Sequence, residues 1–153
     1  MIFVTVGTDQ PFDRMIRAVD AWAGRTGTKD LFAQIGHTKL RPSFIKYVTF
    51  LEPPDYRRQF AAASVIVSHA GMGTILTALS HRKPIVVMPR QAAFGEQRND
   101  HQLATARHLL QLGKIEVAFD DAELTARLDN LAAFASRGVI GPYASLSLIT
   151  ALH

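Results

Sequence analysis

The chain has 153 residues, of which 48% are hydrophobic and 20% charged, and it contains no cysteine. A typical domain has about 100–150 residues, so we expect one domain spanning residues 1–153, without disulfides, thiolate metal sites or cysteine nucleophiles. The net charge of +4 divides into +7 on residues 1–114 and −3 on residues 115–153. The positive part of the chain suits an anionic ligand or an anionic membrane surface. A nucleic-acid partner is not expected, because the sequence has no basic run and no RNA- or DNA-binding motif.

Short β-branched runs alternate with helical periodicity, a pattern typical of βαβ units. We therefore expect an α/β fold, a Rossmann-like domain with a mainly parallel sheet and helices on both faces. In chain order, the expected elements are a strand at residues 2–6, a helix at 12–23, strands at 31–35 and 48–51, a helix at 55–63, a strand at 65–68, a helix at 74–80, a strand at 85–88, a helix at 99–112, a strand at 115–119 and helices at 121–134 and 143–152.

Membrane crossing is not expected, because no apolar run approaches the ~20 residues that a spanning helix needs. The first strand also lacks the basic residues and the long apolar core of an export signal. We therefore expect a cytoplasmic protein that reaches the membrane through a partner.

The loops that follow the strands are the candidate site, because ligands of open parallel sheets bind beyond the carboxyl ends of the strands. Gly7 and Thr8 follow the first strand, and they form either a simple turn or a loop that faces an acceptor phosphate. His69 and a glycine-rich turn follow the fourth strand, and a long loop at residues 89–102 follows the fifth.

The glycine-rich turn places Gly71 and Gly73 at the start of an expected helix. Such a turn leaves N–H groups unpaired at the positive end of the helix dipole, where a phosphate can bind. Glycine is also common in ordinary strand-to-helix turns, and Leu76 stands where a dinucleotide-binding fingerprint has its third glycine. His69 either bonds a phosphate or sugar hydroxyl or packs as a loop histidine, and it is a weak candidate for a catalytic group.

At the end of the long loop, Asn99 has the position of a helix N-cap, and Gln102 that of its partner in a capping box. Alternatively, His101 and Gln102 bond sugar hydroxyls with neutral groups. The sequence contains no nucleophile elbow, Walker loop, zinc-protease helix or D-x-D motif, and its six histidines have no close paired spacing. We therefore expect neither a metal nor a cofactor.

Four segments follow one another along the chain: Val-Thr-Val-Gly-Thr at residues 4–8 with Phe12 and Asp13, Ser-His-Ala-Gly-Met-Gly-Thr at 68–74, Lys-Pro-Ile-Val-Val-Met-Pro at 83–89 and Asn-Asp-His-Gln at 99–102. In order and spacing they resemble the C-terminal domain of family 28 glycosyltransferases. The resemblance covers nearly the whole chain. It is strongest to small donor-binding subunits of split transferases, namely PssE-type exopolysaccharide subunits and the catalytic subunit of the dolichol-linked UDP-GlcNAc transferase.

This resemblance implies the half of a GT-B architecture that binds the UDP-sugar. It also implies a separate, membrane-anchored subunit that binds a lipid-pyrophosphate sugar acceptor and supplies the catalytic base. By position in the family pattern, the expected contacts are the donor diphosphate for Gly71, Met72, Gly73 and Thr74, the transferred sugar for His101 and Gln102, the uracil for Phe50 and Leu51, and the acceptor side for Gly7 and Thr8.

One position departs from the family pattern. Members that bond the ribose diol carry an acidic residue in the helix after the glycine-rich turn, and this chain has Thr77 there. A carboxylate accepts hydrogen bonds from both hydroxyls, which a threonine cannot do. We expect another residue such as Glu96, or the partner subunit, to contact the ribose.

The sequence is compatible with three functions. The leading hypothesis is an inverting, metal-independent transfer of a hexose-type sugar from UDP to the lipid-linked acceptor, in exopolysaccharide or glycolipid biosynthesis. The alternative is a non-catalytic accessory subunit that stabilises or recruits a transferase, which Thr77 favours. The third is a nucleotide-binding oxidoreductase, but this chain lacks both features of that class, the full glycine fingerprint and an acidic residue after the second strand.

Overall fold

The computed structural model describes residues 1–8, 10–112 and 115–131. Within these residues, six parallel strands form one sheet in the order β3-β2-β1-β4-β5-β6. The strands are β1 (Ile2–Thr5), β2 (Leu31–Gln34), β3 (Lys46–Val48), β4 (Val65–His69), β5 (Ile85–Met88) and β6 (Glu116–Val117). The helices are α1 (Asp13–Thr26), α2 (Pro53–Ala62), α3 (Met72–Ser80), α4 (His101–Leu112) and α5 (Asp121–Asp129), with a 3-10 helix η1 (Ala92–Phe94) after β5. The expected α/β fold is confirmed.

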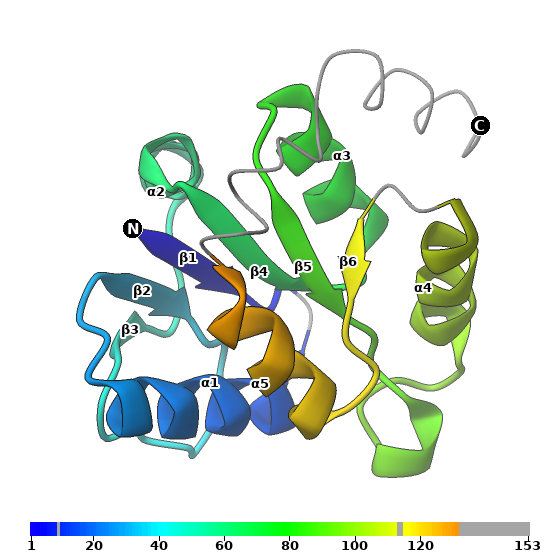
Figure 1. Ribbon diagram of the computed structural model, residues 1–153, viewed down its shortest axis with the longest axis horizontal. Helices are drawn as coiled ribbons and strands as arrows, with labels where there is room; N and C mark the ends of the chain where they lie inside the picture. The colour runs from blue at the N-terminus through cyan, green and yellow to red at the C-terminus, as the bar shows by residue number, and fades with distance from the viewer. Residues whose placement is uncertain (9, 113–114, 132–153) are drawn as a thin grey trace.

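The path of the chain reverses at β1. This strand pairs with β2 on one side and with β4 on the other, so the chain first builds outward to β3 and then returns to the centre of the sheet (Figure 1). In doubly wound sheets, the loops on the two sides of such a switch point diverge and leave a crevice at the carboxyl edge. The loops after β1 and β4 flank this crevice.

Helices cover both faces of the sheet because buried side chains alternate along its strands. Val4, Val67 and Val86 belong to an apolar cluster with α1 and α5 on one face. Phe3 and Ile66, their neighbours in sequence, belong to a second cluster with α2, α3 and α4 on the other face. Figure 1 shows these two helical layers with the sheet between them.

Two helices are joined by a polar contact within the first layer. Trp22 of α1 donates through its indole Nε1–H to Asp129 Oδ1 of α5 at 2.9 Å. Arg25, one turn further along α1, lies 3.5 Å from the same oxygen. The end of α5 is thereby fixed on the face opposite to α3, which contributes to the candidate site.

Several boundaries differ from those expected. The third strand was expected at residues 48–51 and ends instead at Val48, because the chain turns away from β2 after Gly36 and Thr49 form the last backbone hydrogen bond. Phe50 is 48% exposed, so its apolar side chain does not belong to the sheet. Helix α3 begins two residues before its expected start and α4 two residues after it. The expected helix at 143–152 and the end of that at 121–134 lie outside the described residues.

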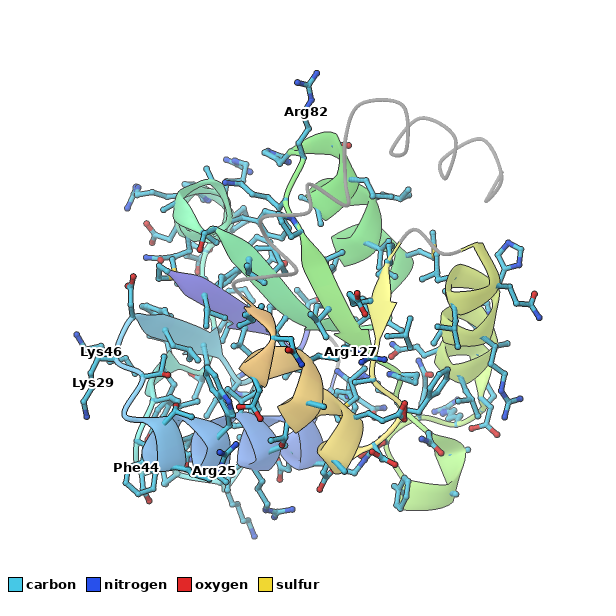
Figure 2. The ribbon with its side chains drawn as sticks, in the orientation of Figure 1. Arg25, Lys29, Phe44, Lys46, Arg82 and Arg127 are labelled. Atoms are coloured by element: carbon cyan, nitrogen blue, oxygen red, sulfur yellow. The ribbon has the colours of Figure 1, made fainter. Side chains whose placement is uncertain are left out.

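Part of the positive charge lies away from the carboxyl edge. Arg25 is in the last turn of α1, Lys29 precedes β2, and Lys46 is the first residue of β3. Figure 2 shows their side chains, together with that of Phe44, projecting at one corner of the molecule. All of them lie at the amino-terminal ends of the strands. The surplus of +7 on residues 1–114 is therefore not confined to the expected site.

No helix among the described residues is both long enough and apolar enough to cross a bilayer.

Candidate functional site

A pocket of about 510 Å³ opens at the carboxyl edge of the sheet. Its size is within the range of about 300–1,000 Å³ that small-molecule sites occupy. The lining comes from the loops after β1, β3, β4 and β5, from the end of β2 and from the first two turns of α2, α3 and α4. The lining residues are Val6, Gly7, Thr8, Gln10, Gln34, Phe50, Leu51, Pro53, Tyr56, Arg57, His69, Gly71, Gly73, Thr74, Thr77, Arg90, Glu96, Gln97 and Gln102.

Helix α3 presents an uncapped N-terminus to the pocket. The residue before it, Gly71, has no side chain to cap it, and the first hydrogen bond of the helix runs from the Ile75 N–H to the Gly71 carbonyl at 3.1 Å. The N–H groups of the first turn therefore face the open end, where the helix dipole is positive. At Gly73, a Cβ atom would meet nothing within 4 Å. This end of α3 is suited to an anion.

His69 fills the space that two glycines leave. A Cβ atom on Gly7 would lie 2.6 Å from the imidazole Nε2, and a Cβ atom on Gly71 would contact the ring carbon Cε1 even more closely. Gly7 also has a φ of +80°, which L-residues with side chains rarely adopt. Both glycines are thus required by the position of one histidine ring.

The hydrogen bonds around His69 define its tautomer. The backbone N–H of Arg90 donates to Gln102 Oε1 at 3.1 Å, so the amide nitrogen of Gln102 faces His69 Nδ1 at 3.0 Å. Because an amide NH₂ group can only donate, Nδ1 accepts, and the neutral ring carries its proton on Nε2. This nitrogen lies 3.5 Å from the Thr74 hydroxyl, on the side of the pocket.

Burial first, and the Arg90 charge second, lower the pKa of His69 from 6.5 to about 4. At neutral pH the ring is therefore uncharged. It can donate one hydrogen bond to a ligand through Nε2–H, and it is not a cation that pairs with a phosphate.

The loop after β1 is shaped by a buried polar network. The Thr5 hydroxyl donates to Gln34 Oε1 at 2.6 Å, and the Gln34 amide donates to the Gly7 carbonyl at 3.2 Å. The Gly7 N–H in turn donates to the Thr5 hydroxyl at 3.2 Å. Gln34 and Thr5 thereby orient Gly7 beside the His69 ring.

Glu96 is engaged with the protein itself. Its two carboxylate oxygens accept hydrogen bonds from Arg14 at 2.9 and 3.0 Å, and one of them also accepts from the Gln91 N–H at 3.0 Å. The Arg14 guanidinium in addition lies 4.6 Å from the centre of the Phe94 ring. Although Glu96 lines the pocket, this bidentate ion pair opposes its expected role as a ribose ligand.

Most of the sequence-predicted residues meet in the pocket. Its lining includes both residues expected at the uracil, both of the acceptor-side loop, His69 and Gln102, and of the four expected at the diphosphate it includes Gly71, Gly73 and Thr74. Met72 instead packs against the apolar layer of α2, α3 and α4. His101 is exposed at the start of α4, outside this lining.

The capping-box interpretation of Gln102 is wrong. Asn99 Oδ1 accepts from the His101 N–H at 2.9 Å, but the first backbone hydrogen bond of α4 runs from the Ala104 N–H to the Asp100 carbonyl, so Asn99 lies one residue before the N-cap position. The Gln102 side chain does not return to Asn99, because it is buried between the Arg90 backbone and His69.

Sequence reasoning missed two buried polar residues of this site, Arg90 and Gln34. Gln34 is the last residue of β2 and Arg90 lies two residues after β5, and a polar residue at the carboxyl end of an apolar strand is a signal that could have identified them. It also missed Tyr56 and Arg57, which line the pocket from α2 and carry no such signal.

The model of the glycosyltransferase family 28 C-terminal domain matches residues 1–137 of this chain. The chain belongs to this family. It is 32% identical over 124 residues to the human UDP-N-acetylglucosamine transferase subunit ALG13, an alignment that covers 74% of this chain and 10% of the human protein. It therefore spans about a tenth of the length of this relative.

Two solved structures share the fold. The NMR solution structure of ALG13 has a TM-score of 0.58 at 19% identity, with 84% of this chain and 83% of that chain covered. The crystal structure of Acinetobacter baumannii MurG has a TM-score of 0.62 at 16% identity, with 97% of this chain and 48% of that chain covered. The family resemblance expected from the four sequence segments is thus confirmed.

Proposed function

We propose that this chain is the UDP-sugar-binding subunit of a split, inverting GT-B glycosyltransferase. One observation carries the proposal: the uncapped first turn of α3, the open space at Gly73 and the Nε2–H of His69 all face the same pocket. Together they provide neutral hydrogen-bond donors and a positive helix end, which is the chemistry that a diphosphate requires. The human relative is a UDP-N-acetylglucosamine transferase subunit, which supports the same nucleotide.

In this proposal the diphosphate lies against Gly71, Gly73, Thr74 and the backbone of Met72, with His69 as an additional hydrogen-bond donor. Phe50 and Leu51 contact the uracil, and Tyr56 is a further aromatic residue of the pocket lining. The transferred sugar lies beside Gln102, and His101 is retained as a sugar contact from the Asn-Asp-His-Gln motif.

The reaction is a single displacement at the anomeric carbon. An acceptor hydroxyl oxygen forms the new bond to this carbon, the bond to the UDP oxygen breaks, and the hydroxyl proton passes to a base on the partner subunit. The negative charge that develops on UDP is stabilised by the N–H groups of α3 and by His69 Nε2–H. This chain thus stabilises the leaving group, and the partner activates the nucleophile.

The partner is a membrane-anchored subunit that binds a lipid-pyrophosphate sugar. The human relative is a subunit of a transferase, which supports a heteromeric enzyme. We place this chain in the cytoplasm, recruited by the partner to the inner face of the membrane, where a hexose-type sugar is added during exopolysaccharide or glycolipid biosynthesis.

The test has two stages. Isothermal titration of the isolated chain should show binding of UDP but not of uridine, because the diphosphate supplies the main contact. Hexose transfer from UDP-sugars should then require co-expression with the partner. If the chain binds no UDP but the partner alone is active and is stabilised by the chain, the accessory-subunit alternative replaces this proposal.

A further inference from the structure

Arg90 joins two walls of the pocket. It follows β5 after Pro89 and is only 3% exposed. Its guanidinium donates to three backbone carbonyls of the loop after β1: to Val6 at 2.5 Å, to Gln10 at 2.6 Å and to Pro11 at 2.7 Å. One side chain therefore holds the backbone on both sides of Gly7 and Thr8 in the loop after β1.

The main chain of Arg90 acts on a second wall of the pocket, which Gln102 and His69 form. Its N–H donates to Gln102 Oε1, and this bond orients the Gln102 amide toward His69. The same His69 ring fits against Gly7 of the acceptor-side loop. Arg90 thus contacts both the loop after β1 and Gln102, which orients His69.

We propose that Arg90 is a positioning residue, which holds the acceptor-side loop in register with the His69–Gln102 pair so that the pocket has its ligand-binding shape. The identity of the ligand as UDP rests on the proposed function, whereas the coupling of the two walls does not.

The geometry requires an arginine. The three carbonyls come from different residues, and a planar guanidinium offers five N–H groups in a fixed fork that can bond all three at once. It also lies 5.0 Å from the centre of the Phe12 ring, which supports it from the side of α1. A lysine ammonium has one nitrogen on a flexible stem and cannot reproduce this arrangement.

Lys83 provides a matched control at the other end of β5. Its Nζ donates to the carbonyls of Ala61 and Ala63, each at 2.7 Å, so it too is a cation that ties down backbone carbonyls. It lies at the amino end of the strand and does not line the pocket. Removing it tests whether the loss of such a cation affects stability alone.

The experiment compares Arg90→Lys, Arg90→Met and Lys83→Met with the wild-type chain by calorimetric titration with UDP and by thermal unfolding. In metal sites, loss of a residue that orients a metal ligand typically weakens metal affinity by roughly 10–100-fold. By analogy, we expect UDP affinity to fall by the lower end of this range in Arg90→Met, about tenfold. Arg90→Lys should lose part of the affinity. Lys83→Met should unfold at a lower temperature and bind UDP as the wild type does.

Either of two results would overturn the proposal. The first is wild-type UDP affinity in Arg90→Met, and the second is an equal loss of UDP affinity in Arg90→Met and Lys83→Met. If Arg90→Met does not fold, Arg90→Lys decides, and undiminished affinity in that variant is evidence against the proposal.

Failure of the proposed function is distinguished by NMR. If the wild-type chain binds no UDP, the imidazole nitrogens of His69 and the amides of Gly7 and Thr8 still report on the two walls. Their signals should shift in Arg90→Lys and stay in place in Lys83→Met. Unshifted signals in Arg90→Lys would refute the coupling, whatever the ligand is.

Discussion

Gly73→Ala should stabilise the protein while it weakens nucleotide binding. Gly73 is the second residue of α3, its φ is not positive, and an added Cβ would meet no protein atom within 4 Å. Alanine is favoured over glycine by about 1 kcal/mol in a helix interior, and we take about half of this for the first turn. Because about 1 kcal/mol shifts the melting temperature of a domain of this size by roughly 2–4 °C, the variant should melt about 1–2 °C higher.

The same methyl group enters the space that we assign to the diphosphate. Gly73 lines the pocket at the uncapped end of α3, so a phosphate oxygen in contact with its backbone N–H would have to move away from the new Cβ. We expect UDP affinity to fall at least about tenfold, equivalent to ~1.4 kcal/mol. Calorimetric titration and thermal unfolding on the same samples measure both effects.

Gly71→Ala is the control, because its Cβ would overlap the His69 ring. Overpacking of this kind costs roughly 1–3 kcal/mol, so this variant should lose both stability and UDP affinity. Unchanged UDP affinity in a stabilised Gly73→Ala variant would show that the diphosphate does not bind at the start of α3. A melting temperature of Gly73→Ala several degrees below that of the wild type would contradict the open space at Gly73.

Three further predictions follow from the pocket. Phe50→Ala should lower UDP affinity about fivefold in a titration, since an aromatic contact is worth roughly 1 kcal/mol, and should change the free energy of unfolding by less than about 0.5 kcal/mol because the side chain is 48% exposed. Thr77→Glu should raise UDP affinity about threefold to tenfold if the ribose lies there, because a carboxylate accepts from both hydroxyls; a loss of affinity would place the ribose elsewhere. Folding lowers the pKa of His69 from 6.5 to about 4, so the unfolded chain takes up the proton at a higher pH than the folded protein. The contribution of His69 to stability is therefore complete above pH 6.5 and is lost as the pH falls toward 4. Over this range the free energy of unfolding should decrease by about 3 kcal/mol. Urea unfolding at several pH values should show this loss in the wild type and not in His69→Asn, and identical pH profiles would refute it.

The sheet could be predicted because its strands are buried on both faces. Residues 65–68 and 85–88 are short apolar runs bounded by polar or turn residues, and the structure agrees with both to within one residue. The edge strand β3 was misplaced because exposed Lys46 and half-buried Tyr47 carry little apolar signal, whereas Phe50 and Leu51 carry a strong one and belong to the pocket.

The candidate site could be predicted only in part. The turn at Gly71 and Gly73 has a local signature, so its position after β4 followed from the sequence. The role of Gln102 did not, because a glutamine at that position also satisfies a capping box, and only the packing of α4 brings it to His69. The bonds from Arg90 to Val6, Gln10 and Pro11 depend on the path of a loop about 80 residues away in sequence, which no local pattern encodes.

The position of His69 between two glycines has a consequence for how this site can change over time. Residues 69 and 71 form one unit, because a side chain at residue 71 is excluded only while the imidazole occupies that space. Substitutions of residues in direct contact are not additive, so an alanine at Gly71 that is harmful beside His69 becomes nearly neutral once the histidine has been replaced by a smaller residue. The order of substitutions is therefore constrained: the histidine has to be lost before the glycine can vary, and a lineage that has filled the glycine position cannot easily recover the histidine.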